Sequence, residues 1–276
     1  MTELSSTDTS ESTGTDGAWQ RWRVAPKSGF EVRGSHDVGL IQIDKNRFRV
    51  EREFRFADDA VITMLTDRLV AKGKTAQAAH DVVEDARTFT PTTENPTDLA
   101  SIPRYMRWFE SAYGAHTLAA IIHDDLIVKE PNGGTLEDDT LSDRFFREMM
   151  KSAEVPWLKR WIMWSAVALR SRWAVGGIRR LSVLVWLVLS AVGITTFVST
   201  VGSATFGWDG PLDTWALLLI ALGLPFVAAF LWGKQYGAGI VAAITALWIL
   251  PAAALAGVGY LVYLALEWAA DRIGLD

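Results

Sequence analysis

Cysteine is absent from all 276 residues, which excludes a disulfide framework and any zinc site built on thiolates. An excess of Lys and Arg is absent from residues 1–154, which hold 27 acidic and 19 basic side chains. We therefore expect no nucleic-acid partner, because phosphate contacts need clustered basic groups. The glycine-rich phosphate loop, the dinucleotide-binding glycine pattern and the HExxH metal-binding motif are also missing, so these common catalytic signatures are excluded.

Charged side chains are missing from three long runs, which are residues 181–208, 214–233 and 235–266. About 20 apolar residues in a helix cross a hydrocarbon core of about 30 Å. The sequence therefore predicts three transmembrane helices, at about 181–203, 214–233 and 238–266, with the lipid bilayer as partner. Two spans plus a re-entrant segment is the alternative. Because no ionisable side chain lies within the spans, we expect an anchor and not a transporter.

Basic residues lie on one side of the predicted spans. Arg179 and Arg180 precede the first span and Lys234 lies between the second and third, whereas loop 209–213 and tail 269–276 carry more acids than bases. Lys and Arg concentrate on the cytoplasmic side of membrane proteins. We therefore expect an integral protein of the inner or plasma membrane, with the N-terminal domain in the cytoplasm and the C-terminus outside. Small residues on the third span would also permit close packing in a homo-oligomer.

The chain divides into segments of different composition. Residues 1–19 form an acidic tail rich in serine and threonine, which cannot bury enough apolar surface to fold and is expected to be disordered. Residues 20–178 are expected to form one cytoplasmic domain, and residues 179–268 to hold the three spans before a short tail at 269–276.

The predicted fold class is α+β, with small N-terminal strands, a helical domain and then an all-α membrane region. Partial alternation of apolar and polar residues between 20 and 56, as in FRVEREFRF, predicts short strands. Apolar residues at helical spacing predict two helices within 58–87, separated at Gly73. Three more helices are expected, at about 115–128, 141–152 and 155–175.

Polar residues between 97 and 143 are the candidates for chemistry. Carboxylates and neutral imidazoles bind Mg, Mn, Fe or Zn, and a bound ion can activate water for hydrolysis. A divalent metal is therefore the cofactor to consider. The candidate ligands are Asp98, His123 and Asp143; the candidate catalytic residues are Asp98, Ser101, His123 and Asp124; Arg104 is the candidate anion-binding group.

A purely structural interpretation of the same residues stays open, and the spacing alone favours it. Asp98 can form an Asx-turn, Asp143 can interact with a helix dipole, and His123 can be a core histidine hydrogen-bonded to Asp98 or Asp124. A Ser101–His123–Asp98 triad has the right residue types, but the GxSxG motif that positions such a serine is missing. A phosphohydrolase built on a His-Asp pair would need His80 as its upstream histidine.

Several motifs, taken in order, resemble a phage and bacterial family known as domain of unknown function 1353. The motifs are TDLASIPR at 97–104, AAIIHDDL at 119–126, SDRFFREMM at 142–150 and the closing helix WLKRWIMWSAVALRSRW at 157–173. The resemblance covers about residues 46–175 and implies a small α+β domain common in phage and prophage neighbourhoods, without an established activity. It strengthens the case for a site at Asp98, Ser101, His123, Asp124 and Asp143.

The chain departs from the family pattern in three places. Asp125 stands where an aromatic residue is usual, which bears on the shape of any pocket. The helices within 58–87 are inserted between the strands and the motifs, and the membrane region is added. The resemblance also implies that helix 155–175 belongs to the domain, which we favour over a helix lying on the membrane surface.

Two functions are compatible with these observations. The first is a membrane-anchored, metal-dependent hydrolase at the inner membrane face. The alternative is a non-catalytic interaction or effector module recruited to the membrane, in which the Asp and His residues of the motifs only hold the fold together.

Overall fold

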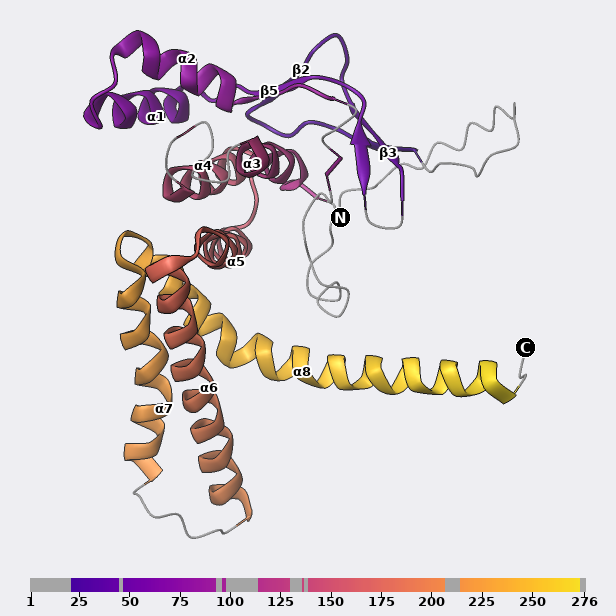
Figure 1. Ribbon diagram of the computed structural model, residues 1–276, viewed down its shortest axis with the longest axis vertical. Coiled ribbons are helices and arrows are strands. Elements are labelled where there is room, and N and C mark those ends of the chain that lie inside the picture. The colour runs from indigo at the N-terminus through magenta and orange to yellow at the C-terminus, as the bar shows by residue number, and fades with distance from the viewer. Residues whose placement is uncertain are drawn as a thin grey trace. The chain divides into compact units, whose positions relative to one another are not determined.

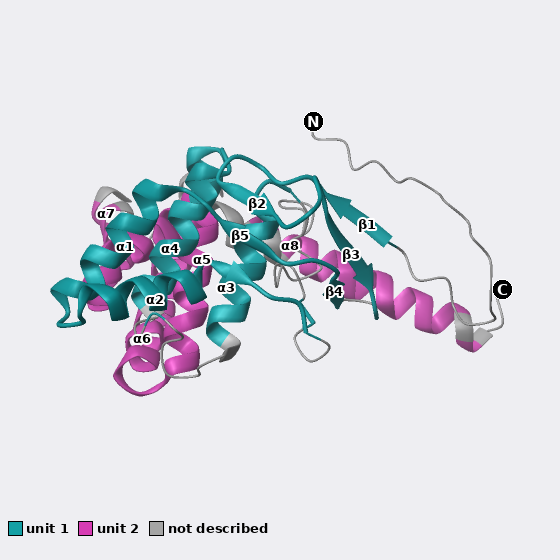
Figure 2. Cartoon of the chain, turned by 90° about the horizontal axis from the view of Figure 1, so that it is seen from above, with its two compact units in different colours: residues 1–102, 111–160 teal, residues 103–110, 161–276 magenta. Residues whose placement is uncertain are grey.

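The computed structural model describes most of the chain. The described residues are 21–44, 47–92, 96–97, 114–129, 136, 139–206 and 214–273. The chain divides into two compact units, coloured separately in Figure 2: unit 1 holds residues 1–102 and 111–160, and unit 2 holds residues 103–110 and 161–276. The tail predicted at 1–19 lies outside the described residues. Small strands with many helices place the chain in the predicted α+β class.

Unit 1 begins with two antiparallel sheets of three strands each (Figure 1). The strands are β1 (Arg21–Val24), β2 (Phe30–Val32), β3 (Val38–Gln42), β4 (Phe48–Val50), β5 (Phe54–Phe56) and β6 (Thr88–Phe89). One sheet has the order β1-β3-β4 and the other β2-β5-β6. The predicted alternation holds in β4 and β5: Phe48 and Val50 are buried around an exposed arginine, and so are Phe54 and Phe56.

Helices α1 (Asp59–Ala71) and α2 (Ala76–Ala86) follow the strands, and each begins at a side-chain cap. The Asp58 carboxylate accepts from the backbone N–H groups of the first turn of α1, and the Thr75 hydroxyl accepts in the same way at α2. Gly73 separates the two helices with a φ of +102°, a left-handed conformation that glycine adopts without a steric penalty. The expected pair of helices with a break at Gly73 is confirmed.

Helices α3 (Thr117–Lys129) and α4 (Asp139–Ser152) form the rest of the core of unit 1. Helix α3 is the most enclosed, because most of its side chains are buried, including Ile121 and Ile122. The ring of Phe145 on α4 meets that of Phe56 edge to face at 5.5 Å and so joins the helix to β5. Ser152, the last residue of α4, donates a hydrogen bond of 2.6 Å to Asp58 at the start of α1. These contacts hold α3 and α4 in the interior of the unit.

Helix α5 (Trp157–Val175) crosses the boundary between the units, since residues 157–160 belong to unit 1 and the rest to unit 2. The sequence places the end of the domain later, at residue 178. Unit 2 continues with α6 (Gly177–Phe206), α7 (Thr214–Ala229), the 3-10 helix η2 (Phe230–Gln235) and α8 (Tyr236–Ile273). Helices α6 and α7 lie side by side as a hairpin (Figure 1).

Two stretches of unit 2 are long and apolar enough to cross a membrane, Gly177–Phe197 and Leu219–Ala246, and a shorter apolar stretch covers Leu255–Ala270. The second stretch passes through Gly233, whose φ of 57° and ψ of −120° interrupt the helix, so it joins the end of α7 to the start of α8 and is not one straight span. The structure thus shows apolar helices in this region. The three-span arrangement stays a prediction.

Candidate functional site

The His123 imidazole and the Asp143 carboxylate form a buried pair between α3 and α4. The Nε2 atom of His123 lies 3.1 Å from Oδ1 of Asp143, and the two residues are 4% and 0% exposed. Both belong to the predicted set of ligands. A buried carboxylate is costly unless a partner compensates it, and the imidazole supplies that compensation.

Helix α4 holds the imidazole from a second direction through Phe146. The rings of His123 and Phe146 lie 5.0 Å apart at an angle of 43°. Phe146 follows Asp143 by three residues, so the two side chains share one face of α4. Sequence reasoning did not include Phe146 among the site residues, although its spacing from Asp143 was the available signal. The imidazole therefore has its orientation determined by an acid and by an aromatic ring.

The pair with Asp143 has a consequence for the proton of His123. If Nε2 carries the proton and donates it to the carboxylate, Nδ1 of the neutral ring has the free lone pair. Among the described residues no hydrogen bond to Nδ1 occurs. Histidines that bind metals commonly donate their other ring N–H to a carboxylate. The distance is also compatible with direct sharing of an ion, because two adjacent octahedral ligands about 2.1 Å from a metal lie about 3 Å apart.

Asp124 points away from this pair and toward the first motif. Adjacent residues on a helix project about 100° apart. Asp124 is half-buried and accepts a hydrogen bond of 3.4 Å from the hydroxyl of Thr97, the first residue of TDLASIPR. Thr97 is held in turn by two backbone hydrogen bonds with Phe48 on β4, of 2.8 and 2.9 Å. Adjacent residues of α3 thus contact the first motif, through Thr97, and the third motif, through Asp143.

Three predicted site residues, Asp98, Ser101 and Arg104, lie outside the described residues. Of the predicted metal ligands the structure therefore describes only His123 and Asp143, and of the serine triad only His123. Within the part of the chain that the structure describes, no group of three or more His, Asp or Glu side chains could hold a metal ion. A complete metal site would need Asp98. Asp125 is buried on α3.

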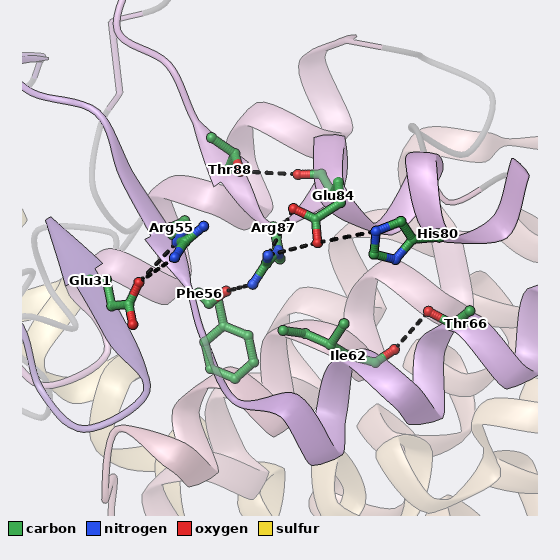
Figure 3. Close-up of polar contacts among 9 residues, drawn as sticks. All are labelled: Glu31, Arg55, Phe56, Ile62, Thr66, His80, Glu84, Arg87 and Thr88. Atoms are coloured by element: carbon green, nitrogen blue, oxygen red, sulfur yellow. Dashed lines mark hydrogen bonds and ion pairs between the residues drawn. The ribbon is translucent and has the colours of Figure 1, made fainter. Parts of the chain in front are cut away.

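His80 is placed in a different set of contacts, on α2 (Figure 3). Its Nε2 atom lies 4.0 Å from Glu84, and the His80 side chain is exposed. Arg87 donates to Glu84 and to the backbone carbonyl of Phe56, which ties the end of α2 to β5. The described contacts of His80 are thus with its own helix and not with His123. They give no support to a phosphohydrolase site that uses His80 as its upstream histidine.

His116 is a second buried histidine and lies one residue before α3. The sequence did not predict a shifted pKa for it. Burial and, to a smaller extent, the nearby ammonium of Lys159 together lower its pKa to about 4. The imidazole is therefore neutral at pH 7. Burial and a nearby cation both disfavour the charged form of an imidazole. We therefore assign His116 to the core and not to the site.

No curated protein and no solved structure matches this chain. Residues 77–167 match the model of a family described as "Protein of unknown function (DUF1353)". The matched part runs from α2 into α5 and includes the His123–Asp143 pair; it is shorter than the range of about 46–175 over which the motifs resemble the family. Strands β1 to β5, helix α1 and helices α6 to α8 lie outside it. Residues 77–167 are thus similar to this family of unknown function.

Proposed function

We propose that this chain is a membrane-anchored protein whose N-terminal domain is a metal-assisted hydrolase on the cytoplasmic side of the membrane. The observation that carries the proposal is that adjacent residues of α3 contact both other motifs: His123 pairs with Asp143, and Asp124 accepts a hydrogen bond from Thr97. Residues from three separate motifs thus supply a grouping of acids, imidazole and hydroxyl along α3. Such a grouping is typical of sites that bind an ion or move a proton.

Each residue has a defined role in this proposal. Asp143 orients the imidazole, so that Nδ1 of His123 faces the ion or accepts a proton. Asp98 would complete the set of ligands, and Asp124 would act as a base or orient the base. Arg104 would bind an anionic group of the substrate. A divalent ion bound there would polarise the substrate and supply an activated water.

The proposed anchor rests on the apolar surface of unit 2. Large aliphatic side chains are exposed along each long helix, among them Val188 on α6, Leu219 on α7 and Leu261 on α8. Soluble proteins rarely expose contiguous apolar patches larger than a few hundred Å². Lipid tails would cover these side chains without the cost that water imposes. We place the N-terminal domain in the cytoplasm and the C-terminus outside, as the distribution of Lys and Arg indicates.

The metal content of the full-length protein in detergent tests the catalytic part of the proposal. We expect a divalent metal in stoichiometric amount in the wild type, measured by elemental analysis, and its loss in a His123→Asn variant that keeps its helical circular dichroism. His80→Asn is the matched control, because His80 is exposed and interacts with its own helix. Equal metal content in wild type and His123→Asn would contradict the proposal.

A non-catalytic interaction module is the second candidate, and the burial of His123 and Asp143 favours it. A polar pair removed from water can serve to fix how two helices pack. On this alternative the purified wild type is metal-free, and His123→Asn lowers the melting temperature because the Asp143 carboxylate is left buried without its partner. Metal content and melting temperature, measured on the same two proteins, therefore separate the two candidates.

A further inference from the structure

The junction between α5 and α6, here residues 170–181, exposes basic and apolar side chains together. Gly176 and Gly177 adopt left-handed φ values of +78° and +54° and end one helix before the next begins. Trp173, Ile178 and Leu181 are exposed around this turn. Six Lys or Arg and no acid occur between residues 159 and 180. The junction thus combines positive charge with exposed apolar surface.

Arg180 is held in place across the turn. Its Nε atom donates a hydrogen bond of 3.0 Å to the backbone carbonyl of Trp173, and its guanidinium lies 5.3 Å from the centre of the Trp173 ring. A Cβ placed on Gly176 would lie 3.8 Å from Nη2 of Arg180, so the guanidinium also passes close to the glycine turn. These contacts from backbone, ring and turn hold the guanidinium before any ligand arrives.

Most of the hydrogen-bonding capacity of Arg180 remains available. A guanidinium carries five N–H donors, and the bond to Trp173 uses one of them. Among the described residues Arg180 makes no other hydrogen bond. A planar group with two parallel donors matches two oxygens of a phosphate, and Arg binds phosphate in this bidentate way. The geometry therefore suits a phosphate group.

The apolar neighbours distinguish among molecules that carry a phosphate. Ile178 is 78% exposed and Leu181 is 53% exposed. Free phosphate or a polar phosphorylated ligand would leave both side chains in water. A phospholipid places its phosphate at the level of the Arg and its acyl chains against the apolar side chains. The excess of basic residues favours a lipid with net negative charge.

We propose that the α5–α6 junction binds the headgroup of an anionic phospholipid, with Arg180 on the phosphate and Trp173 beside the glycerol region. The proposal rests on the membrane anchor proposed above and adds to it a site of defined chemistry. A second Arg–Trp pair provides an internal comparison: Arg272 lies 4.7 Å from the Trp268 ring near the end of α8. Acidic residues adjoin that pair in the sequence, at Glu267 and Asp271, so it should not attract anions.

The test uses the full-length protein reconstituted in nanodiscs of phosphatidylcholine and phosphatidylglycerol. After partial delipidation, native mass spectrometry gives the ratio of the two lipids retained. We expect the lipid retained by the wild type to be enriched in phosphatidylglycerol. In Arg180→Gln the enrichment should be about fivefold lower, because one basic group at an anionic surface contributes about 1 kcal/mol. Arg272→Gln is the matched control and should retain the wild-type ratio. Equal ratios in all three proteins, or equal losses in the two variants, would overturn the proposal.

Two further arms complete the experiment. If Arg180→Gln fails to reconstitute, Arg180→Lys replaces it: partial loss of enrichment supports bidentate binding by Arg180, and an unchanged ratio overturns it. Inorganic phosphate added as competitor should not remove the enrichment; if it does, the junction binds free phosphate and the lipid assignment is wrong. Failure of the anchor is recognised separately, because the wild type would then be released by alkaline carbonate from vesicles of either lipid.

Discussion

The histidines associated with α3 show how different the surroundings of two identical side chains can be. His123, in the middle of the helix, faces the Asp143 carboxylate at 3.1 Å. His116, just before the helix, is fully buried, and desolvation together with Lys159 holds its pKa well below its ordinary value. Identical side chains seven residues apart thus meet opposite electrostatic conditions, because one faces an acid and the other a base.

The buried His116 leads to a prediction about the dependence of stability on pH. Its pKa is about 4 in the folded protein and 6.5 ordinarily. Between these values the unfolded chain binds more protons, so folding is favoured by high pH and the free energy of unfolding falls as the pH drops from 6.5 toward 4. The loss from this group amounts to about 3 kcal/mol at most.

Thermal unfolding in detergent, followed by tryptophan fluorescence across that pH range, checks this expectation. A His116→Gln variant should lose less stability on acidification than the wild type, although it starts from a different value. His80→Gln serves as control, since His80 is exposed. Parallel pH profiles for wild type and His116→Gln would show that the buried imidazole is not the group responsible.

At the scale of elements, small residues determine how closely the helices of unit 2 approach. A Cβ placed on Gly193 of α6 would lie 2.6 Å from the backbone carbonyl oxygen of Ala221 on α7 and 3.2 Å from Pro225. Real Cβ atoms do not approach backbone so closely. Gly239 at the start of α8 is similar, with Ala229 at 3.0 Å from such an atom. These glycines are required by packing and not by backbone conformation.

We therefore predict that Gly193→Ala destabilises the α6–α7 hairpin by about 1–3 kcal/mol, because the helices must move apart to admit the methyl group. Gly202→Ala on the same helix is the matched control: nothing lies within 4 Å of a Cβ there, and alanine should favour the helix by up to about 1 kcal/mol. Melting temperatures in detergent should move in opposite directions. A fall of equal size in both variants would show that close packing is not the cause.

At the scale of the whole molecule, the proposed arrangement in the membrane makes a prediction about accessibility. The chain has no cysteine, so single cysteines can be introduced without a background. A membrane-impermeant maleimide should label Arg272→Cys on intact cells, and should label Ser35→Cys and Lys234→Cys only after permeabilisation. Protection of Arg272→Cys on intact cells would instead favour two spans with a re-entrant segment, since the C-terminus would then lie inside.

Local patterns in the sequence were sufficient for most of the elements, because helix and strand periodicity depends on neighbours along the chain. The alternation around Phe48 and Phe54, the break at Gly73 and the uncharged runs each identify an element or its end without reference to distant residues. The absence of cysteine and of common catalytic motifs limited the classes of function in the same way.

Only the tertiary structure decided which polar residues meet. The sequence offered Asp98 or Asp124 as the hydrogen-bond partner of His123. The packing of α3 on α4 instead pairs it with Asp143, and Asp124 accepts from Thr97. Distance along the chain does not determine such contacts, because they depend on how helices and strands pack in three dimensions. The low pKa of His116 and the fixed orientation of Arg180 likewise arise from burial and from neighbours brought together by folding.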